Sequence, residues 1–186
     1  DMGYGVNIDY SLPYSENGEI GIGASYEYSP DNYYIDYDTL NGETYVKDIM
    51  RSFSREVGTN EYDLYLTVQQ KWGNFVLKPG IRMEYERLWS NISGYETVNQ
   101  TEDYLNWRPS IHISYRTKSM HNFSLSYSRR IAPPSARDIT SFKFYSTESF
   151  STGNPDLLPT YTNSVEGGWT KYWNKFGSVG LTAYYR

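Results

Sequence analysis

The stretch that decides the fold is residues 122–131, which read NFSLSYSRRI. Apart from Arg129, every second side chain in it is apolar, and a period of two residues indicates a β-strand with one apolar and one polar face. Pro133 and Pro134 lack the N–H that a strand ladder needs, so we expect the strand to end before them. One side carries Phe123, Leu125, Tyr127 and Ile131, and the other carries Ser124, Ser126, Ser128 and Arg130.

The same alternation recurs along the chain and predicts an all-β fold, an antiparallel up-and-down meander of about eight long strands. The other predicted strands cover residues 2–10, 19–28, 61–72, 75–87, 104–117, 161–173 and 176–186. Short connections at 11–18, 73–74, 118–121 and 174–175 alternate with long polar loops at 29–60, 88–103 and 132–160. Within the first long loop, residues 45–53 show a weak strand pattern.

Composition limits the class of protein. The 186 residues predict a single domain, residues 1–186. Only 38% of them are hydrophobic, yet 18% are aromatic, including 21 tyrosines, which argues against disorder and favours strands. A net charge of -5 gives no electrostatic support for nucleic-acid binding, and the absence of cysteine excludes thiol chemistry and disulfides. The sequence contains no run of about eighteen apolar residues, so it predicts no transmembrane helix.

Three features favour a β-barrel in a membrane. The predicted strands are about twice the usual length for globular proteins and suit a tilted crossing of an apolar band of ~25 Å. Tyr and Trp cluster near the strand ends, as in the aromatic girdles at membrane interfaces. Short and long connections alternate strictly, as they do in outer-membrane barrels. The alternative is a soluble β-sandwich or small closed barrel acting as a ligand-binding module, which has the same strand period.

The polar faces supply the candidate ligand-binding residues. If the eight strands closed into a barrel by themselves, its interior would be narrow. The charged residues on 75–87 and 104–117 fit a wide, water-filled lumen better than a narrow one. We therefore expect an open arc of a larger barrel. The candidates in the lumen are Arg82, Arg108, His112 and Arg116, and the candidates in the loops are Arg130, Arg137, Asp138 and Tyr145. We expect Arg130, Arg137 and Asp138 to form a charge cluster that holds the third loop. We predict no catalytic residues, no metal site and no cofactor, and hence no enzyme.

The third loop and its flanks also resemble a known family. Residues 125–135 read LSYSRRIAPPS, Arg137-Asp138-Ile139 follows, and residues 153–159 read GNPDLLP. These motifs resemble the barrel of TonB-dependent outer-membrane receptors, and most of all the outer-membrane β-barrel proteins of Bacteroides-type bacteria. Pro133 stands where the pattern usually has Arg.

The resemblance implies a location in the bacterial outer membrane and a barrel of about 22 strands with a plugged lumen, of which this chain supplies a contiguous third. It implies uptake of a nutrient of the glycan, siderophore or peptide class. The implied partners are outer-membrane lipid, the nutrient, a surface lipoprotein, and TonB acting through a plug domain that this chain lacks. A structural or adhesion barrel is the remaining alternative.

Overall fold

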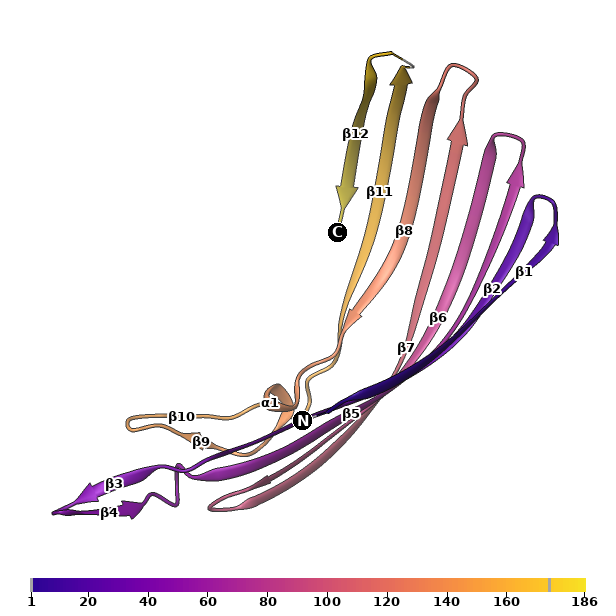
Figure 1. The fold of residues 1–186 in the computed structure, drawn as a ribbon. Helices are drawn as coiled ribbons and strands as arrows, with labels where there is room; N and C mark the ends of the chain where they lie inside the picture. The colour runs from indigo at the N-terminus through magenta and orange to yellow at the C-terminus, as the bar shows by residue number, and fades with distance from the viewer. Residues whose placement is uncertain (1, 174) are drawn as a thin grey trace.

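The computed structural model describes residues 2–173 and 175–186. Eight strands form one antiparallel sheet in which each strand pairs with its neighbours along the chain (Figure 1). The all-β meander predicted from the sequence is therefore confirmed. In sheet order the strands are β1 (Tyr4–Ser15), β2 (Gly18–Ile35), β5 (Phe53–Trp72), β6 (Phe75–Ser93), β7 (Thr97–Arg116), β8 (His121–Ala132), β11 (Thr160–Trp173) and β12 (Gly177–Tyr185).

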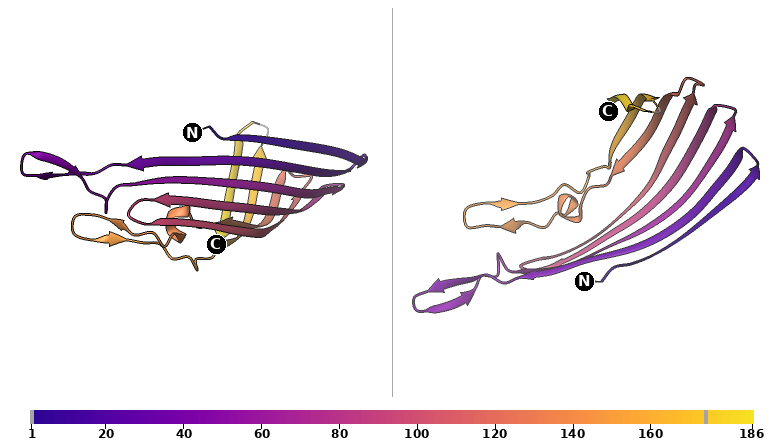
Figure 2. Two further views of the ribbon diagram at one scale, coloured as in Figure 1. Left: turned by 90° about the horizontal axis from the view of Figure 1, so that it is seen from below. Right: turned by 45° about the horizontal axis from the view of Figure 1, so that its top comes forward.

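Small elements occupy two of the connections. The segment between β2 and β5 holds a hairpin of β3 (Asp38–Asn41) and β4 (Thr44–Lys47). The segment between β8 and β11 holds the short helix α1 (Ala136–Ile139) and a hairpin of β9 (Phe144–Tyr145) and β10 (Phe150–Ser151). Both hairpins extend from the same end of the sheet, opposite the short turns (Figure 2). No helix within the described ranges has the length and hydropathy to cross a membrane.

Two predicted loops are wrong in extent. Residues 88–103 are not a loop, since β6 and β7 continue to the pair Ser93↔Thr97. Residues 29–60 are mostly strand, since β2 and β5 pair as far as Ile35↔Phe53. Beyond the apolar band the apolar side chains change face, with Leu88 and Ile92 buried on the concave side of β6, so the alternation that reveals a strand is broken while the backbone ladder continues. The predicted turn at Asn174 lies outside the described residues, and the loop at 132–160 stays a connection with little regular structure.

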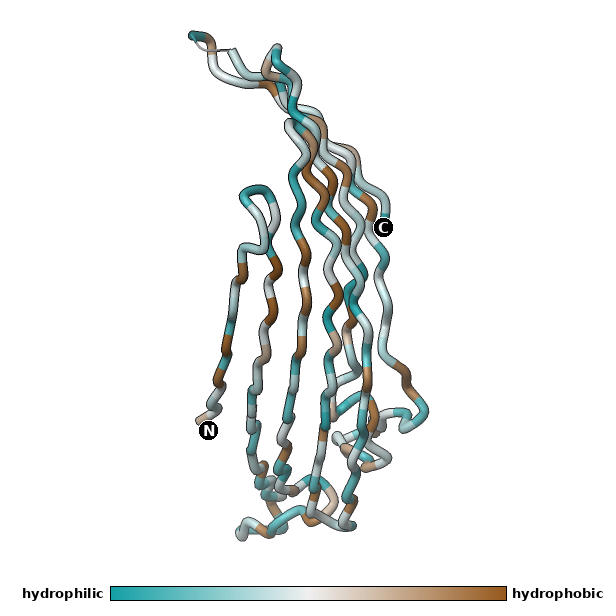
Figure 3. Tube along the Cα trace, turned by 90° about the vertical axis from the view of Figure 1, so that its right-hand side faces the viewer, coloured by the Kyte–Doolittle hydropathy of each residue, from teal (hydrophilic) through white to brown (hydrophobic). Residues whose placement is uncertain are grey.

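The sheet is a curved arc, and its two faces differ in chemistry (Figures 1 and 2). Apolar side chains on the convex face stay open to the surroundings, as the exposed fractions of Leu64 (53%) and Trp107 (50%) show. Their chain neighbours Asp63 and Asn106 point to the concave face and are buried there. A polar interior and an apolar exterior are the arrangement of a membrane barrel. Along the strands, hydrophobic residues concentrate toward the end with the short turns (Figure 3).

A row of tyrosine rings marks one edge of this apolar band. The ring of Tyr26 lies 6.0 Å from that of Tyr4 and 4.8 Å from that of Tyr62, which in turn lies 6.0 Å from that of Tyr85. On β6 the band runs from Phe75 to Tyr85. At about 3.4 Å per residue and a tilt of about 40°, that length spans on the order of 25 Å, the height of the apolar band of outer-membrane barrels.

The arc is open within the described residues. β1 pairs only with β2, and β12 pairs only with β11. A soluble sandwich would need a second large sheet packed against this one, and the described residues contain only two further sheets, of two strands each. The arrangement of the described residues therefore favours an arc of a barrel over a soluble β-sandwich.

Candidate functional site: the concave face and the loop folded over it

Charged side chains from three neighbouring strands meet on the concave face. Arg82 lies directly opposite Arg108, and Glu84 lies directly opposite Asp63. Like charges directly opposite one another on neighbouring strands destabilise a sheet. Here each arginine pairs with a carboxylate diagonally across from it, which offsets the repulsion. Arg108 Nη1 donates to Glu84 Oε2 at 2.6 Å, and Arg82 Nη1 lies 3.4 Å from Asp63 Oδ2. Because the side chains of Glu84 and Asp63 are only 6% and 8% exposed, these pairs form largely away from water.

The same region carries more acid than base. Carboxylate oxygens of Glu61, Asp63 and Glu84 lie within 4.8 Å of one another, a spacing at which carboxylates can ligate a divalent cation. Glu86 lies opposite Glu61 in the register. Two of these four carboxylates already bind arginines, so a metal would have to compete with existing ion pairs. The sequence predicted no metal site, and nothing in this geometry requires one.

His112 lies farther toward the short turns. It faces Lys78 and Ser126 in the register and lines a small cavity of about 210 Å³ together with Ser110. No charged cluster surrounds it.

Arg116 ends β7, with its guanidinium 5.8 Å from the ring centre of Tyr172. The structure therefore brings Arg82 and Arg108 together and leaves His112 and Arg116 apart from them.

The ends of β8 and β11 leave the sheet and bend over the concave face (Figure 1). β8 pairs with β7 only from Ser128 to Asn122, while its pairing with β11 continues to Ala132. Tyr161 of β11 donates a hydrogen bond from its hydroxyl to Asn106 Oδ1 of β7 at 3.2 Å. This contact skips β8 in the sheet order, so the strand pair β8–β11 is folded inward at its end.

Helix α1 then packs on the concave face of β5 and β6. Ala136 and Ile139 form a buried apolar cluster with Val57 and Leu88. Phe142 is 1% exposed, and its ring lies 5.6 Å from that of Phe53. Because Val57 and Leu88 belong to the lumen-facing set of their strands, the loop at 133–159 lines the arc from inside.

The four loop residues that the sequence suggested as ligand-binding candidates lie in or next to the folded-in loop. Asp138 closes a capping box with Ser135, and these hydrogen bonds lower the pKa of the Asp138 carboxyl. Arg137 lies 5.2 Å from the ring centre of Phe144. Tyr145 of β9 contacts Tyr95 edge-on, with ring centres 5.3 Å apart. Arg130 is exposed, and no ion pair among the described residues joins Arg130 or Arg137 to Asp138, so the charge cluster that the sequence predicted does not form.

Backbone contacts in the folded loop explain why the Gly-Asn-Pro motif begins with glycine. Gly153 donates its N–H to Thr140 O at 2.9 Å, and Asn154 donates to Asp138 O at 2.7 Å. A Cβ on Gly153 would lie 2.4 Å from the carbonyl oxygen of Asp138, closer than side-chain carbons ever come to backbone. The motif therefore requires glycine there because the returning chain passes directly against the end of α1.

A cavity of about 560 Å³ lies between α1 and the concave face of β2 and β5. Its most buried charged residue is Arg55, which is 8% exposed. Arg55 Nη2 binds Asp31 Oδ2 at 2.6 Å, and its guanidinium carbon lies 4.5 Å from the ring centre of Tyr33. The sequence analysis missed Arg55 because residue 55 was assigned to a loop. The polar, lumen-facing residues of β5 have odd numbers, as Asp63 does. Continuing that alternation toward the start of the strand would have placed Arg55 on the lumen face.

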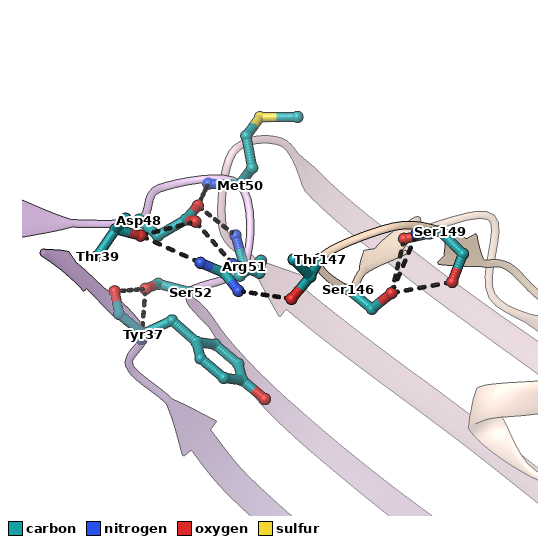
Figure 4. A network of polar contacts seen from close by, with 9 residues as sticks. All are labelled: Tyr37, Thr39, Asp48, Met50, Arg51, Ser52, Ser146, Thr147 and Ser149. Carbon is teal, nitrogen blue, oxygen red and sulfur yellow. Dashed lines mark hydrogen bonds and ion pairs between the residues drawn. The ribbon is translucent and has the colours of Figure 1, made fainter.

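Polar contacts join the two outer connections at the rim (Figure 4). Arg51 donates from Nε to Asp48 Oδ2 at 2.7 Å and from Nη1 to Thr147 Oγ1 at 3.3 Å. The hydrogen bonds and charge of Arg51 lower the pKa of Asp48. The segment before β5 and the β9–β10 hairpin are therefore connected directly.

The sequence profile of the outer membrane protein beta-barrel family matches residues 2–186. The chain belongs to that family. A search of curated proteins gives no match. Membership of the outer membrane protein beta-barrel family places the protein in the bacterial outer membrane, which agrees with the predicted localisation. In such a barrel the convex face with Leu64 and Trp107 meets lipid, and the concave face with the arginine–carboxylate pairs meets the lumen.

Proposed function

We propose that the protein is a receptor and transporter barrel for TonB-dependent uptake of a nutrient of the glycan, siderophore or peptide class. The observation that carries the proposal is the loop at 133–159, which folds into the arc and encloses a cavity with lumen-facing strands. An outward-projecting loop would leave the lumen unlined. A lining loop at one mouth of a barrel forms a binding surface through which a solute has to pass.

In this proposal the long connections 36–52 and 133–159 lie on the cell surface, and the opposite end of the sheet lies on the periplasmic side, as the lengths of such connections in known barrels suggest. The three-residue turn 94–96 is at the same end of the sheet as the long connections and lies on the cell surface with them. Energy reaches the barrel from TonB through a plug domain in the lumen, and a surface lipoprotein is a further partner at the outer mouth. The acidic groups around Arg82 and Arg108 offer charge for contacts with a plug. We propose no catalytic role, because two of those carboxylates are held in ion pairs.

The decisive experiment compares nutrient uptake in a wild-type strain, a strain with this gene deleted, and a strain with tonB deleted. A nutrient whose uptake falls in both deletion strains, and recovers when each gene is restored, supports the proposal. Uptake that depends on this gene but survives the loss of tonB contradicts the energy coupling. A deletion strain with normal growth on every glycan, siderophore and peptide tested would favour a structural barrel instead.

The proposed orientation of the barrel in the membrane can be tested separately. Intact cells are treated with protease and the fragments are mapped. We expect cleavage between residues 36 and 52 and none at the short turns. The opposite pattern would overturn the proposed orientation.

A further inference from the structure

The cavity between α1 and the strands β2 and β5 has the chemistry of an anion site. We propose that it binds an oxyanion group, a carboxylate or a phosphate, on the transported solute, with Arg55 and Arg137 as the recognition residues. The proposal deepens the uptake function and rests on it for the origin of the solute. The binding step itself can be tested without transport.

The first argument is the state of Arg55. Its side chain is 10% exposed, and it forms an ion pair with Asp31 through Nη2. Its Nε is buried and has no hydrogen-bond partner among the residues that the structure describes. A buried donor on a charged group that stays unpaired is costly, and native structures rarely tolerate one without a role. Because this Nε is closed to the solvent, an oxyanion in the cavity would act on the guanidinium through its charge and offset part of that cost.

The second argument is the charge around the cavity. The charged residues among its lining are Arg55, Arg137 and a single acidic residue, Asp31. The formal balance is two positive charges against one negative. The side chain of Asp31 is 68% exposed, so water weakens its competition with an incoming anion. Arg137 belongs to the loop and Arg55 to strand β5, so a ligand that contacted both would bridge the folded-in loop and the barrel wall.

The third argument is the character of the remaining lining. Val57, Leu88 and Ala136 form an apolar wall, and Thr59 and Ser135 add hydroxyl groups. A cavity of about 560 Å³ with an apolar wall and a few convergent polar groups is typical of small-molecule sites. Arginine forks match the two oxygens of a carboxylate or phosphate, which gives the class of ligand.

The experiment titrates the purified protein in detergent micelles with inorganic phosphate, glucuronate and glucose by isothermal calorimetry. Glucuronate and glucose share a ring and differ in the carboxylate. We expect saturable binding of at least one of the two anions and none of glucose. Phosphate binding alone assigns the site to phosphorylated solutes, and glucuronate binding alone assigns it to carboxylated ones.

Variants separate this site from general charge effects. Arg55→Gln and Arg55→Lys should each weaken anion binding by about tenfold or more, the latter because lysine lacks the fork. Arg137→Gln removes an exposed charge and should weaken binding without disturbing the barrel, so it carries the test if the Arg55 variants do not fold. Arg87→Gln is the matched control, since Arg87 precedes Leu88 on the convex face and should bind as the wild type does.

The inference fails if neither anion binds, or if the affinity is the same in the wild type, Arg55→Gln and Arg137→Gln. Its failure is distinct from failure of the proposed function. Arginine-dependent anion binding in micelles without any uptake in cells would keep the site and reject transport. Uptake of a neutral nutrient without anion binding in micelles would keep transport and reject the site.

Discussion

Tyr161 on β11 donates a hydrogen bond to Asn106 on β7 at 3.2 Å, across the place that β8 holds in the sheet order. Asn106 is 2% exposed; its Oδ1 accepts this bond, and its Nδ2 has no hydrogen-bond partner among the described residues. Arg129 lies over the Tyr161 ring at 4.2 Å, on the same inward-bent pair of strands. This hydrogen bond ties the end of the folded-in loop to the wall of the arc.

Replacing that tyrosine should loosen the loop. Tyr161→Phe removes the only acceptor bond of a buried amide and should lower the stability of the loop docking by about 1–2 kcal/mol. The measurement is the rate of proteolysis within residues 133–159 in micelles, which should rise. Tyr184→Phe, at a residue 71% exposed, is the control and should leave the rate unchanged. Equal rates in both variants would show that the hydrogen bond does not hold the loop.

The apolar contact of α1 should matter more than the hydrogen bond. Ile139 is 1% exposed, and Ile139→Ala should cost about 2–4 kcal/mol through lost packing and the cavity left behind. Amide hydrogen exchange should then speed up in residues 133–159 while the strands stay protected. Leu158→Ala in the same loop, at a residue 80% exposed, should have no such effect. Uniform exchange across loop and strands in Ile139→Ala would mean that the loop and barrel unfold together.

The two faces of β8 should respond oppositely to the same substitution. Leu125→Arg places a charge on the lipid face and should destabilise the folded barrel by about 2–4 kcal/mol near the bilayer midplane. Ser126→Arg, one residue along on the lumen face, should be tolerated. The fraction of heat-modifiable, folded protein on a cold gel after refolding into lipid vesicles measures both. A deficit in Ser126→Arg as large as in Leu125→Arg would reverse the assignment of the faces.

The diagonal ion pairs should be energetically coupled. Glu84→Gln leaves Arg108 opposite Arg82 with its partner removed, and should cost about 1–3 kcal/mol of unfolding free energy. Arg108→Gln should cost a similar amount, and the double variant should cost less than the sum of the two. Urea unfolding in lipid vesicles provides the three values. Strict additivity would show that the 2.6 Å contact contributes nothing.

The rim contact of Asp48 should depend on pH. Arg51 lowers the pKa of Asp48 below its usual value of 3.8, so the contact stabilises the connection above that value and is lost as the pH falls through the lowered pKa. Cleavage between residues 36 and 52 by an acid-active protease should therefore increase at the acid end of its range. Asp48→Asn should be cleaved readily at every pH, with no acid step from this residue. A wild-type protein whose cleavage is flat with pH would contradict this role.

Sequence alone determined the eight strands, their order and their two faces. Side-chain alternation is a local property, and between Phe75 and Tyr85 lipid on one face and water on the other keep it strict. In residues 88–103 the apolar residues Leu88 and Ile92 lie on the concave face, so the pattern was broken and this part of the strands was missed.

Only the tertiary structure decided which charged residues meet. The partners Arg55 and Asp31 are 24 residues apart in the chain, and so are Arg108 and Glu84. Their contacts depend on strand register, which ladder pairing sets. The inward bend of β8 and β11 likewise follows from the packing of Ile139 against Val57 and Leu88, a long-range contact that no local pattern contains. The strands thus follow from local alternation, whereas the cavity exists because distant apolar groups draw a loop into the arc.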